Sequence, residues 1–308
     1  MVEKPSRSIV GGARWVAIGA DGGGTHVRLA ARLVGAARTV RAETVGINAA
    51  ADPEGAARTL LDGVARLQRE LGAQGEPTAL FAGLAGAMDR ALCDGVRARM
   101  PLARVVVEDD RGIAVAGALA GADGAVAGIG TGSFVGRVHG GAARLVGGWG
   151  FRVADQASGA WLGRALLTRA VLHADGVAEG GATVQATAGE FGSPLAISKF
   201  AVGASPADYA RFAPRVMDAA DRGEADLLAI VRDGADYVVR ALAALGWRDD
   251  EPLCLVGGVG PRLAPFLPAP HRAAVRKPVG SPLEGALRRA EALARAAGSE
   301  ADTLGRVG

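Results

Sequence analysis

Asp21-Gly22-Gly23-Gly24-Thr25 is the stretch that decides the fold of this chain, and it stands between two apolar runs of strand length, residues 15–20 and 27–33. Glycines allow backbone conformations that other residues avoid, and without a Cβ they let a phosphate approach the main chain. Successive N–H groups in such a turn form a concavity that binds anions, and the hydroxyl of Thr25 adds a donor. We therefore predict a strand–turn–strand unit whose turn binds nucleotide phosphates through Gly22, Gly23, Gly24 and Thr25.

A second turn of the same kind, Gly130-Thr131-Gly132-Ser133, follows about 110 residues later between the strand-like runs 125–129 and 134–138. A weaker glycine pair, Gly257-Gly258, follows the run 253–256. One cluster would say little in a chain with 47 glycines, but two clusters that both carry threonine between strands are hard to attribute to chance. They predict one half-domain used twice, which binds a nucleotide from both sides through Gly130, Thr131, Gly132, Ser133 and, for adenosine, Gly257 and Gly258.

Asp21 requires a different role, because its carboxylate would repel a phosphate. A hard cation such as Mg²⁺ prefers carboxylate and phosphate oxygens, so Asp21 is predicted to hold Mg²⁺ directly or through water. The four histidines, His26, His139, His173 and His271, lack the spacing of metal ligands, so we assign no metal site to them.

The composition is that of a globular enzyme with a substantial core, since 49% of the 308 residues are hydrophobic and 22% are charged. The duplication predicts two lobes, residues 1–119 and 120–308, with the C-terminal helix completing the first lobe. A net charge of +3 without a cluster of basic residues argues against a nucleic-acid partner.

Several features predict a cytoplasmic protein without a membrane partner. No apolar run reaches the ~18 residues that a membrane span needs, and residues 1–14 lack the apolar segment of a signal peptide. Cys93 and Cys254 stand alone, which fits a reducing compartment and argues against disulfides or a metal cluster.

Periodicity and capping residues predict further elements. Asp52-Pro53 begins a helix with an apolar stripe at helical spacing, and Ser281-Pro282-Leu283-Glu284 is a capping box that begins the last helix. We expect the tail after Gly298 to fray and the proline-rich residues 261–270 to be irregular. The remaining expected strands are residues 39–44, 78–84 and 104–107, and the remaining expected helices follow Asp110 and span 158–172, 208–220 and 224–245.

The order of motifs resembles the BadF/BadG/BcrA/BcrD group: DGGGT, a strand that ends in Asp, GTGS, GGWG, a D-Q-x-S-G run and GGVG. The resemblance extends over residues 15–295. It implies an α/β, two-lobed actin-like ATPase fold, a duplicated ribonuclease H-like fold with the nucleotide in the cleft between the lobes. Within the group the chain is most similar to glucosamine kinase and N-acetylglucosamine kinase. That similarity implies ATP and Mg²⁺ as cofactors, a small amino sugar as substrate and a homodimer.

A sugar kinase needs a base that accepts the hydroxyl proton as the γ-phosphoryl group moves. Three carboxylates, Glu108, Asp109 and Asp110, follow the strand-like Val105-Val106-Val107. In the family, the catalytic Asp is the third residue after such a strand, and Gly-Ala follows seven and eight residues later. Gly117 and Ala118 fit that offset from Asp110.

Asp109 remains the rival base, because some relatives carry a Gly three residues after the Asp and Gly112 fits Asp109. Arg111 departs from the small residue that is usual at its position. Acidic residues can also simply cap the start of a helix, an interpretation that suits Glu108 best.

The resemblance also implies the sugar contacts. Asn48 matches an asparagine that bonds sugar hydroxyls, Gly86 can offer only its backbone, and Trp149 can stack on the sugar or pack in the core. Asp155 would bind ring hydroxyls or the 2-substituent, where a carboxylate suits an ammonium group. Gln156 is typical of glucosamine kinases rather than N-acetylglucosamine kinases, although Ala157 replaces the usual Gly.

The sequence therefore predicts the phosphorylation of glucosamine to glucosamine 6-phosphate, with N-acetylglucosamine kinase as the alternative. A remote alternative is the ATPase activator of a dehydratase, but those proteins carry clustered cysteines that this chain lacks. A non-catalytic sugar sensor would lack the base, whereas Asp110 is present.

Overall fold

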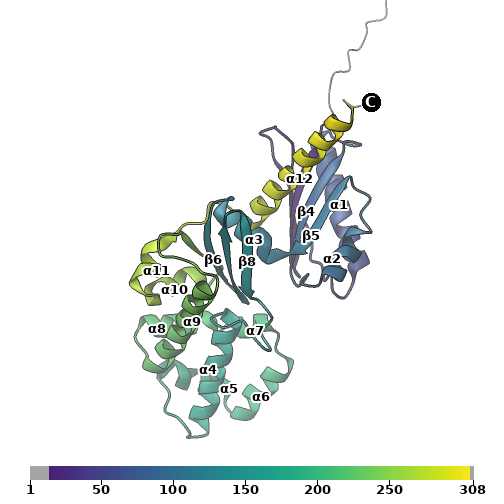
Figure 1. Cartoon of the computed structure of the whole chain (residues 1–308). Coiled ribbons are helices and arrows are strands. Elements are labelled where there is room, and N and C mark those ends of the chain that lie inside the picture. The colour runs from purple at the N-terminus through teal and green to yellow at the C-terminus, as the bar shows by residue number, and fades with distance from the viewer. Residues whose placement is uncertain (1–13, 306–308) are drawn as a thin grey trace, which may run out of the picture. The chain divides into compact units, whose positions relative to one another are not determined.

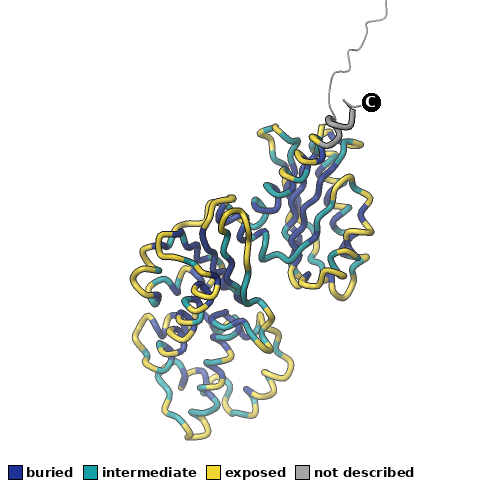
Figure 2. Tube along the Cα trace, in the orientation of Figure 1, coloured by how far each residue is buried: buried dark blue, intermediate teal, exposed yellow. Residues whose placement is uncertain are grey.

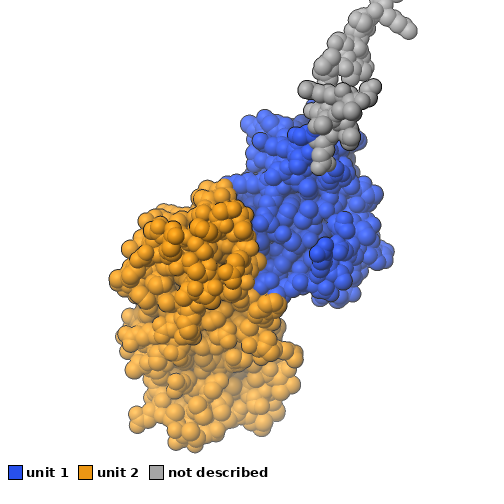
Figure 3. Space-filling model, in the orientation of Figure 1, with its two compact units in different colours: residues 1–117, 280–308 blue, residues 118–279 orange. Residues whose placement is uncertain are grey.

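The structure is a computed structural model that describes residues 14–305. Residues 1–13, in which we predict no signal peptide, and residues 306–308 lie outside the described part. The chain divides into two compact units, shown in blue and orange in Figure 3. Unit 1 comprises Met1–Gly117 and Gly280–Gly308, and unit 2 comprises Ala118–Val279. The C-terminal helix therefore folds with the N-terminal unit.

Unit 1 contains a five-stranded sheet in the order β3-β2-β1-β4-β5. Its strands are β1 (Val16–Gly22), β2 (His26–Leu33), β3 (Val40–Val45), β4 (Thr78–Leu84) and β5 (Arg104–Asp109). The first three form an antiparallel meander, and β4 and β5 run parallel to β1. The DGGGT stretch spans the end of β1 and the turn into β2, as predicted.

Unit 2 repeats this plan with the order β10-β9-β6-β7-β8. Its strands are β6 (Gly124–Ile129), β7 (Ser133–His139), β8 (Ala142–Gly147), β9 (Leu253–Val256) and β10 (Val275–Arg276). Again an antiparallel meander is extended by two strands parallel to its first strand. The two sheets share one order and one pattern of directions, which confirms the predicted α/β fold with a repeated half-domain.

Helices cover both faces of the sheet of unit 1 (Figure 1). They are α1 (Pro53–Leu71), α2 (Arg90–Arg97), the start of α3 (Asp110–Leu119) and α12 (Pro282–Gly305). Because side chains alternate along a strand, Val16, Ile18 and Ala20 pack with α1, whereas Ala17 packs with Ala286, Leu287 and Ala290 of α12. The central strands β1 and β4 between these layers are almost entirely buried (Figure 2).

Both predicted helix starts are confirmed. Asp52 caps α1, since its Oδ1 accepts a hydrogen bond of 2.8 Å from the N–H of Gly55. At the start of α12, Ser281 and Glu284 form the capping box through their side chains and backbone N–H groups. The prediction of a frayed tail after Gly298 is wrong, because α12 continues to Gly305.

Most helices of unit 2 come between β8 and β9 in the sequence. They are α4 (Gly159–Ala174), α5 (Ala182–Phe191), α6 (Pro194–Gly203), α7 (Pro206–Ala210), α8 (Ala213–Asp221) and α9 (Ala225–Ala244), followed by α10 (Gly260–Leu263), the 3₁₀ turn η1 (Ala264–Phe266) and α11 (Ala269–Ala274). The single helix predicted over 208–220 is wrong. In a continuous helix Pro214 would lack the N–H for a hydrogen bond and would clash with the carbonyl four residues earlier. The chain therefore breaks between α7 and α8.

The proline-rich residues 261–270 are also more regular than predicted. Prolines stand in the first turn of α10, η1 and α11, a position where the fixed φ of proline favours a helix and its missing N–H has no helical partner. Among the helices of residues 14–305, none is both long enough and apolar enough to cross a membrane.

Candidate active site

Three parallel strands of unit 1 end at one edge of its sheet. Asp21 on β1 is in register with Gly83 on β4, and Gly83 is in register with Glu108 on β5. The segments that follow these strands, which are the glycine turn, the turn after β4 and the start of α3, therefore meet at this edge. The carboxyl edge of a parallel sheet is where α/β proteins commonly bind ligands.

The first glycine turn packs against the loop after β3. The N–H of Ile47 donates to the carbonyl of Gly23 at 3.1 Å. A Cβ on Gly22 would lie 2.6 Å from Cδ2 of Leu84, whereas a Cβ on Gly24 would meet nothing within 4 Å. None of Gly22, Gly23 and Gly24 has a left-handed φ, so the conformational freedom invoked above is not the reason for glycine here. Close packing requires Gly22, and Gly24 leaves the main chain open beside the exposed Thr25.

Asn48 and Gly86 both lie next to this turn. The exposed Asn48 follows Ile47, and its Oδ1 accepts a hydrogen bond of 3.1 Å from the N–H of Ala51, so part of its side chain stabilises a turn. Gly86 has a φ of +76° in the turn after β4. The N–H of Ala85 donates to the carbonyl of Gly22 at 2.8 Å, which ties that turn to the glycine loop.

The three consecutive carboxylates have different partners. Glu108 forms an ion pair with Arg289 of α12. Asp109 accepts a hydrogen bond of 3.0 Å from the backbone N–H of Arg111 and a second one from the Nε of that side chain. Asp110 is the first residue of α3 and forms no ion pair within the described part of the chain.

Electrostatic coupling and strand alternation distinguish the two aspartates. The charge of Asp109 raises the pKa of the Cys93 thiol on α2, although burial contributes more to that rise. Asp110 is coupled to Asp109 and, less strongly, to Asp21, and both charges raise its pKa. Val105 and Val107 of β5 pack with Val96 and Cys93 of α2, so strand alternation places Asp109 on the α2 side, whereas Asp110 begins α3.

Asp110 is the most perturbed carboxylate at this edge. Its pKa is raised from 3.8 to about 6, mainly by burial and further by the charges of Asp109 and Asp21, while Arg111 opposes the rise. Gly112, which had favoured Asp109 as the base, has a packing explanation. A Cβ on Gly112 would lie 2.2 Å from Oε1 of Glu108. Burial and charge thus distinguish Asp110 from Asp109, which is paired with Arg111.

The second glycine turn lies in unit 2 against the start of α4. The N–H of Gly159 donates to the carbonyl of Gly130 at 2.7 Å, and the hydroxyl of Ser133 donates to the carbonyl of Gln156 at 2.6 Å. Ser133 is buried and its proton is engaged, whereas Thr131 is exposed. Thr131 is therefore the hydroxyl of this turn that can reach a phosphate.

Asp155 lies beside this turn, only 6% exposed and with a φ of +63°. Its Oδ2 is 3.0 Å from the position that a Cβ on Gly132 would occupy, and its buried Oδ1 has no hydrogen-bond partner. Burying a charged group without a partner is costly, so a donor from a ligand would satisfy this oxygen.

The third glycine cluster packs on the second. Gly257 has a φ of +86°, and a Cβ there would lie 2.4 Å from the carbonyl oxygen of Ile129. Gly258 is open, because a Cβ would meet nothing within 4 Å. Gly130, Thr131 and Gly258 line one cavity of about 370 Å³ in unit 2, together with Ala213, Met217 and Arg262.

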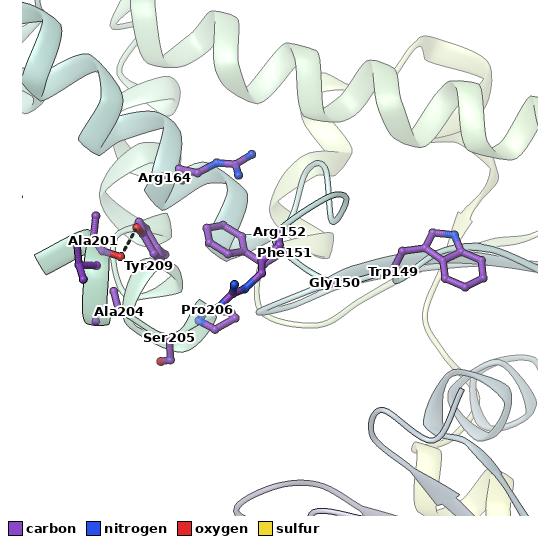
Figure 4. Close-up of a pocket in the computed structure, with 12 residues that line it drawn as sticks. Trp149, Gly150, Phe151, Arg152, Arg164, Ala201, Ala204, Ser205, Pro206 and Tyr209 are labelled. Carbon is purple, nitrogen blue, oxygen red and sulfur yellow. Dashed lines mark hydrogen bonds between the residues drawn. The ribbon is translucent and has the colours of Figure 1, made fainter. Parts of the chain in front are cut away.

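Trp149 is 68% exposed, which excludes the core-packing interpretation. It stands at the edge of a pocket of about 750 Å³ and lies apart from Phe151, Arg164 and Tyr209 at the other end (Figure 4). There the guanidinium of Arg164 lies 4.9 Å from the centre of the Phe151 ring, and the Tyr209 hydroxyl donates to the carbonyl of Ala201 at 3.4 Å.

Comparison with known proteins supplies the remaining observation. The sequence profile of the BadF/BadG/BcrA/BcrD ATPase family matches residues 18–287 of this chain. The chain belongs to this ATPase family. It is also 28% identical over 275 residues to glucosamine kinase GspK of Vibrio cholerae serotype O1, a match that covers 88% of this chain and 94% of that protein.

Two solved structures resemble this member of the family. A protein of Chromobacterium violaceum, provisionally named an N-acetylglucosamine kinase, is 28% identical, with a TM-score of 0.79 over 91% of this chain and 100% of its own. A protein of Porphyromonas gingivalis with the same provisional name is 21% identical, with a TM-score of 0.63 over 89% of this chain and 98% of its own. The second similarity shows the fold alone.

The residues of this ATPase-family chain fit Mg²⁺ held mainly by a nucleotide. Among residues 14–305, no group of three or more histidine, cysteine, aspartate or glutamate side chains could hold a metal ion by itself. Mg²⁺ typically uses one or two carboxylates and completes its shell with water and phosphate oxygens. Asp21, at the end of β1 beside the glycine turn, can supply such a carboxylate.

Sequence reasoning missed two residues at these sites. Tyr237 of α9 belongs to an apolar helical pattern in the sequence, and it packs against the core of unit 2 as that pattern predicts. Its hydroxyl, however, lies 2.6 Å from the position of a Cβ on Gly147, and the charge of Asp155 adds to the effect of burial in raising its pKa. Arg289 lies far along the chain from Glu108, so no local pattern could have connected them.

Proposed function

We propose that this chain is an ATP-dependent amino-sugar kinase that phosphorylates glucosamine on its 6-hydroxyl. The observation that carries the proposal is Asp110, a half-buried carboxylate with a pKa of about 6, coupled to Asp21 beside the first glycine turn. Membership of an ATPase family and similarity to a glucosamine kinase support the same reaction.

We assign the ATP phosphates to the turns at residues 22–25 and 130–133, with main-chain N–H groups and the hydroxyls of Thr25 and Thr131 as donors. Adenosine fits the cavity lined by Gly258, Ala213 and Met217, which offers an open main chain and an apolar wall. Asp21 would hold Mg²⁺, which neutralises phosphate charge when it is bound.

Asp110 would act as the general base. A carboxylate with a pKa of about 6 is ionised at neutral pH and still has some affinity for a proton, as a general base requires. It would accept the proton of the 6-hydroxyl as that oxygen attacks the γ-phosphoryl group. Positioning of the sugar and stabilisation of charge would supply the rest of the acceleration.

Asp155 is the residue that favours glucosamine. Its buried Oδ1 lacks a partner, and an ammonium group at carbon 2 would supply a charge-assisted hydrogen bond. Asn48 and the backbone of Gly86 would bind ring hydroxyls, and the exposed Trp149 would cover an apolar face of the sugar.

N-acetylglucosamine is the second candidate acceptor, because the similar protein of Chromobacterium violaceum bears that name at the same 28% identity. The dehydratase-activator alternative needs clustered cysteines. Here Cys93 lies in unit 1 and donates to the carbonyl of Ala87, whereas Cys254 is buried in unit 2. We also expect a homodimer in the cytoplasm, which the elution volume of the purified protein and fractionation of cells would test.

A coupled ADP-release assay tests the function directly. Purified protein with MgATP would be supplied in turn with glucosamine, N-acetylglucosamine, glucose and mannosamine, with Asp110→Asn as the matched inactive control. We expect the highest kcat/KM with glucosamine. Turnover that is independent of every sugar, or equal in the control, would contradict the kinase proposal.

A further inference from the structure

The start of α3 carries an unusual concentration of negative charge. Glu108, Asp109 and Asp110 are consecutive and would repel one another, and Asp21 adds a fourth carboxylate nearby. A base that must ionise at neutral pH cannot lie among several uncompensated negative charges, because each of them raises its pKa.

Arg111 pairs with Asp109, the carboxylate next to Asp110 in the chain. Its Nε donates to Oδ1 of Asp109, and its backbone N–H donates to the same oxygen at 3.0 Å. Both side chains are largely buried, with 14% of Arg111 and 15% of Asp109 exposed. Removing one partner of a pair that is so shielded from solvent leaves the other charge uncompensated, which costs more than at an exposed pair.

Asp109 lies on the α2 side of the sheet, because Val105 and Val107 of the same strand pack with Val96 and Cys93 of α2 and side chains alternate along a strand. Asp110 instead begins α3 at the edge where β1 ends in Asp21. The positive charge of Arg111 also acts on Asp110, where it opposes the rise in the pKa of that carboxyl.

We propose that Arg111 is a positioning residue for the reaction: it holds Asp109 on the α2 side and neutralises it, so that Asp110 alone presents a carboxylate to the sugar. The inference rests on the proposed function, in which Asp110 is the base. Arg289 of α12 pairs in the same way with Glu108. The pair of Arg111 with Asp109 joins residues only two positions apart, so it is local to the site.

A double-mutant cycle on the full-length protein tests the proposal. Arg111→Met should lower kcat/KM for glucosamine at least tenfold, because the charge of Asp109 is then uncompensated next to Asp110. Asp109→Asn in the same chain should restore kcat/KM to within about threefold of the Asp109→Asn single variant. Arg111→Lys should retain part of the activity, and Arg58→Met, which removes an exposed pair with Glu54 on α1, should change it less than twofold.

A second readout does not depend on the kinase reaction. Cys254 is 2% exposed, so alkylation of the folded protein should report Cys93. Arg111→Met should slow alkylation at pH 8, because the uncompensated charge of Asp109 raises the pKa of the thiol further, and adding Asp109→Asn should reverse this effect.

The two readouts separate the two hypotheses. If the wild-type protein phosphorylates no sugar while the alkylation cycle behaves as expected, the proposed function fails and the pairing of Arg111 with Asp109 stands. If Arg111→Met matches the wild type, or if adding Asp109→Asn rescues neither turnover nor alkylation, the positioning role is refuted. Thermal unfolding of each variant identifies any loss that is due to misfolding.

Discussion

Asp110 at the start of α3 and Asp21 at the end of β1 are electrostatically coupled, and the charge of Asp21 helps to raise the pKa of Asp110 to about 6. The coupling connects the residue assigned to the base with the residue assigned to Mg²⁺. A cation bound at Asp21 would reverse this effect, because a positive charge favours the ionised form of Asp110.

Replacing Asp21 with alanine should abolish ATP turnover while the fold persists. The side chain is not part of the apolar core, so its loss leaves no apolar cavity, whereas the proposed Mg²⁺ ligand disappears. Steady-state kinetics with a titration of Mg²⁺, together with thermal unfolding, would measure both effects. Glu43→Ala, which removes an exposed carboxylate on β3, is the control. Near-normal turnover with an unchanged requirement for Mg²⁺ would disprove the assignment of Asp21.

Asp110→Asn should stabilise the protein at neutral pH. Because the folded-state pKa of about 6 lies above the ordinary value of 3.8, the folded protein binds more protons than the unfolded chain between these pH values. The free energy of unfolding therefore falls as pH rises through this window, and the penalty is complete above about pH 6. We expect a gain on the order of 1–3 kcal/mol at pH 7.

Urea unfolding of the wild type and of Asp110→Asn at pH 7 and pH 4 would measure this gain. The difference between the two proteins should shrink at pH 4, where Asp110 is protonated in the folded state. A variant that is no more stable than the wild type at pH 7 would show that burial does not destabilise the ionised form of Asp110.

Gly257 and Gly258 should respond differently to alanine. Gly257→Ala forces a left-handed φ on a non-glycine residue and places its Cβ 2.4 Å from the carbonyl oxygen of Ile129, so the unfolding free energy should fall by about 1–3 kcal/mol or more. Gly258→Ala meets no atom within 4 Å and should leave the unfolding temperature unchanged. It should nevertheless weaken ATP binding in a calorimetric titration, because its Cβ enters the proposed adenosine cavity. Unchanged ATP affinity in Gly258→Ala would exclude adenosine from this cavity.

Asp155→Asn should change the preference among sugars. Loss of the charge removes a charge-assisted hydrogen bond to the ammonium group, so kcat/KM for glucosamine should fall about tenfold or more, whereas kcat/KM for N-acetylglucosamine should fall less. The ratio of the two values in the ADP-release assay is the measurement. Equal losses for both sugars would mean that Asp155 does not read the 2-substituent.

Local sequence was enough to predict the hairpins and the caps. The turns at residues 22–25 and 130–133, the cap at Asp52 and the capping box at Ser281 all depend on neighbouring residues, and each was found where it was expected. The break between α7 and α8 is also local, because Pro214 marks it, but the apolar pattern across residues 208–220 concealed it.

Tertiary contacts decided what sequence could not. The hydroxyl of Ser133 is consumed by the carbonyl of Gln156, and the ion pair of Glu108 with Arg289 joins β5 to the last helix. The choice between Asp109 and Asp110 likewise depends on Arg111 and Asp21, whose positions in space no spacing rule supplies.

The most direct test of the account compares kcat for Asp110→Asn and Asp109→Asn with glucosamine as acceptor. General-base assistance contributes about 10²–10⁴-fold, so Asp110→Asn should lower kcat by that factor with little change in the affinity for sugar. Asp109→Asn should lower kcat less than about tenfold, since Asp109 is paired with Arg111 and lies toward α2. A larger loss for Asp109→Asn than for Asp110→Asn would contradict the assignment of the base, and full activity in both variants would contradict the proposed mechanism.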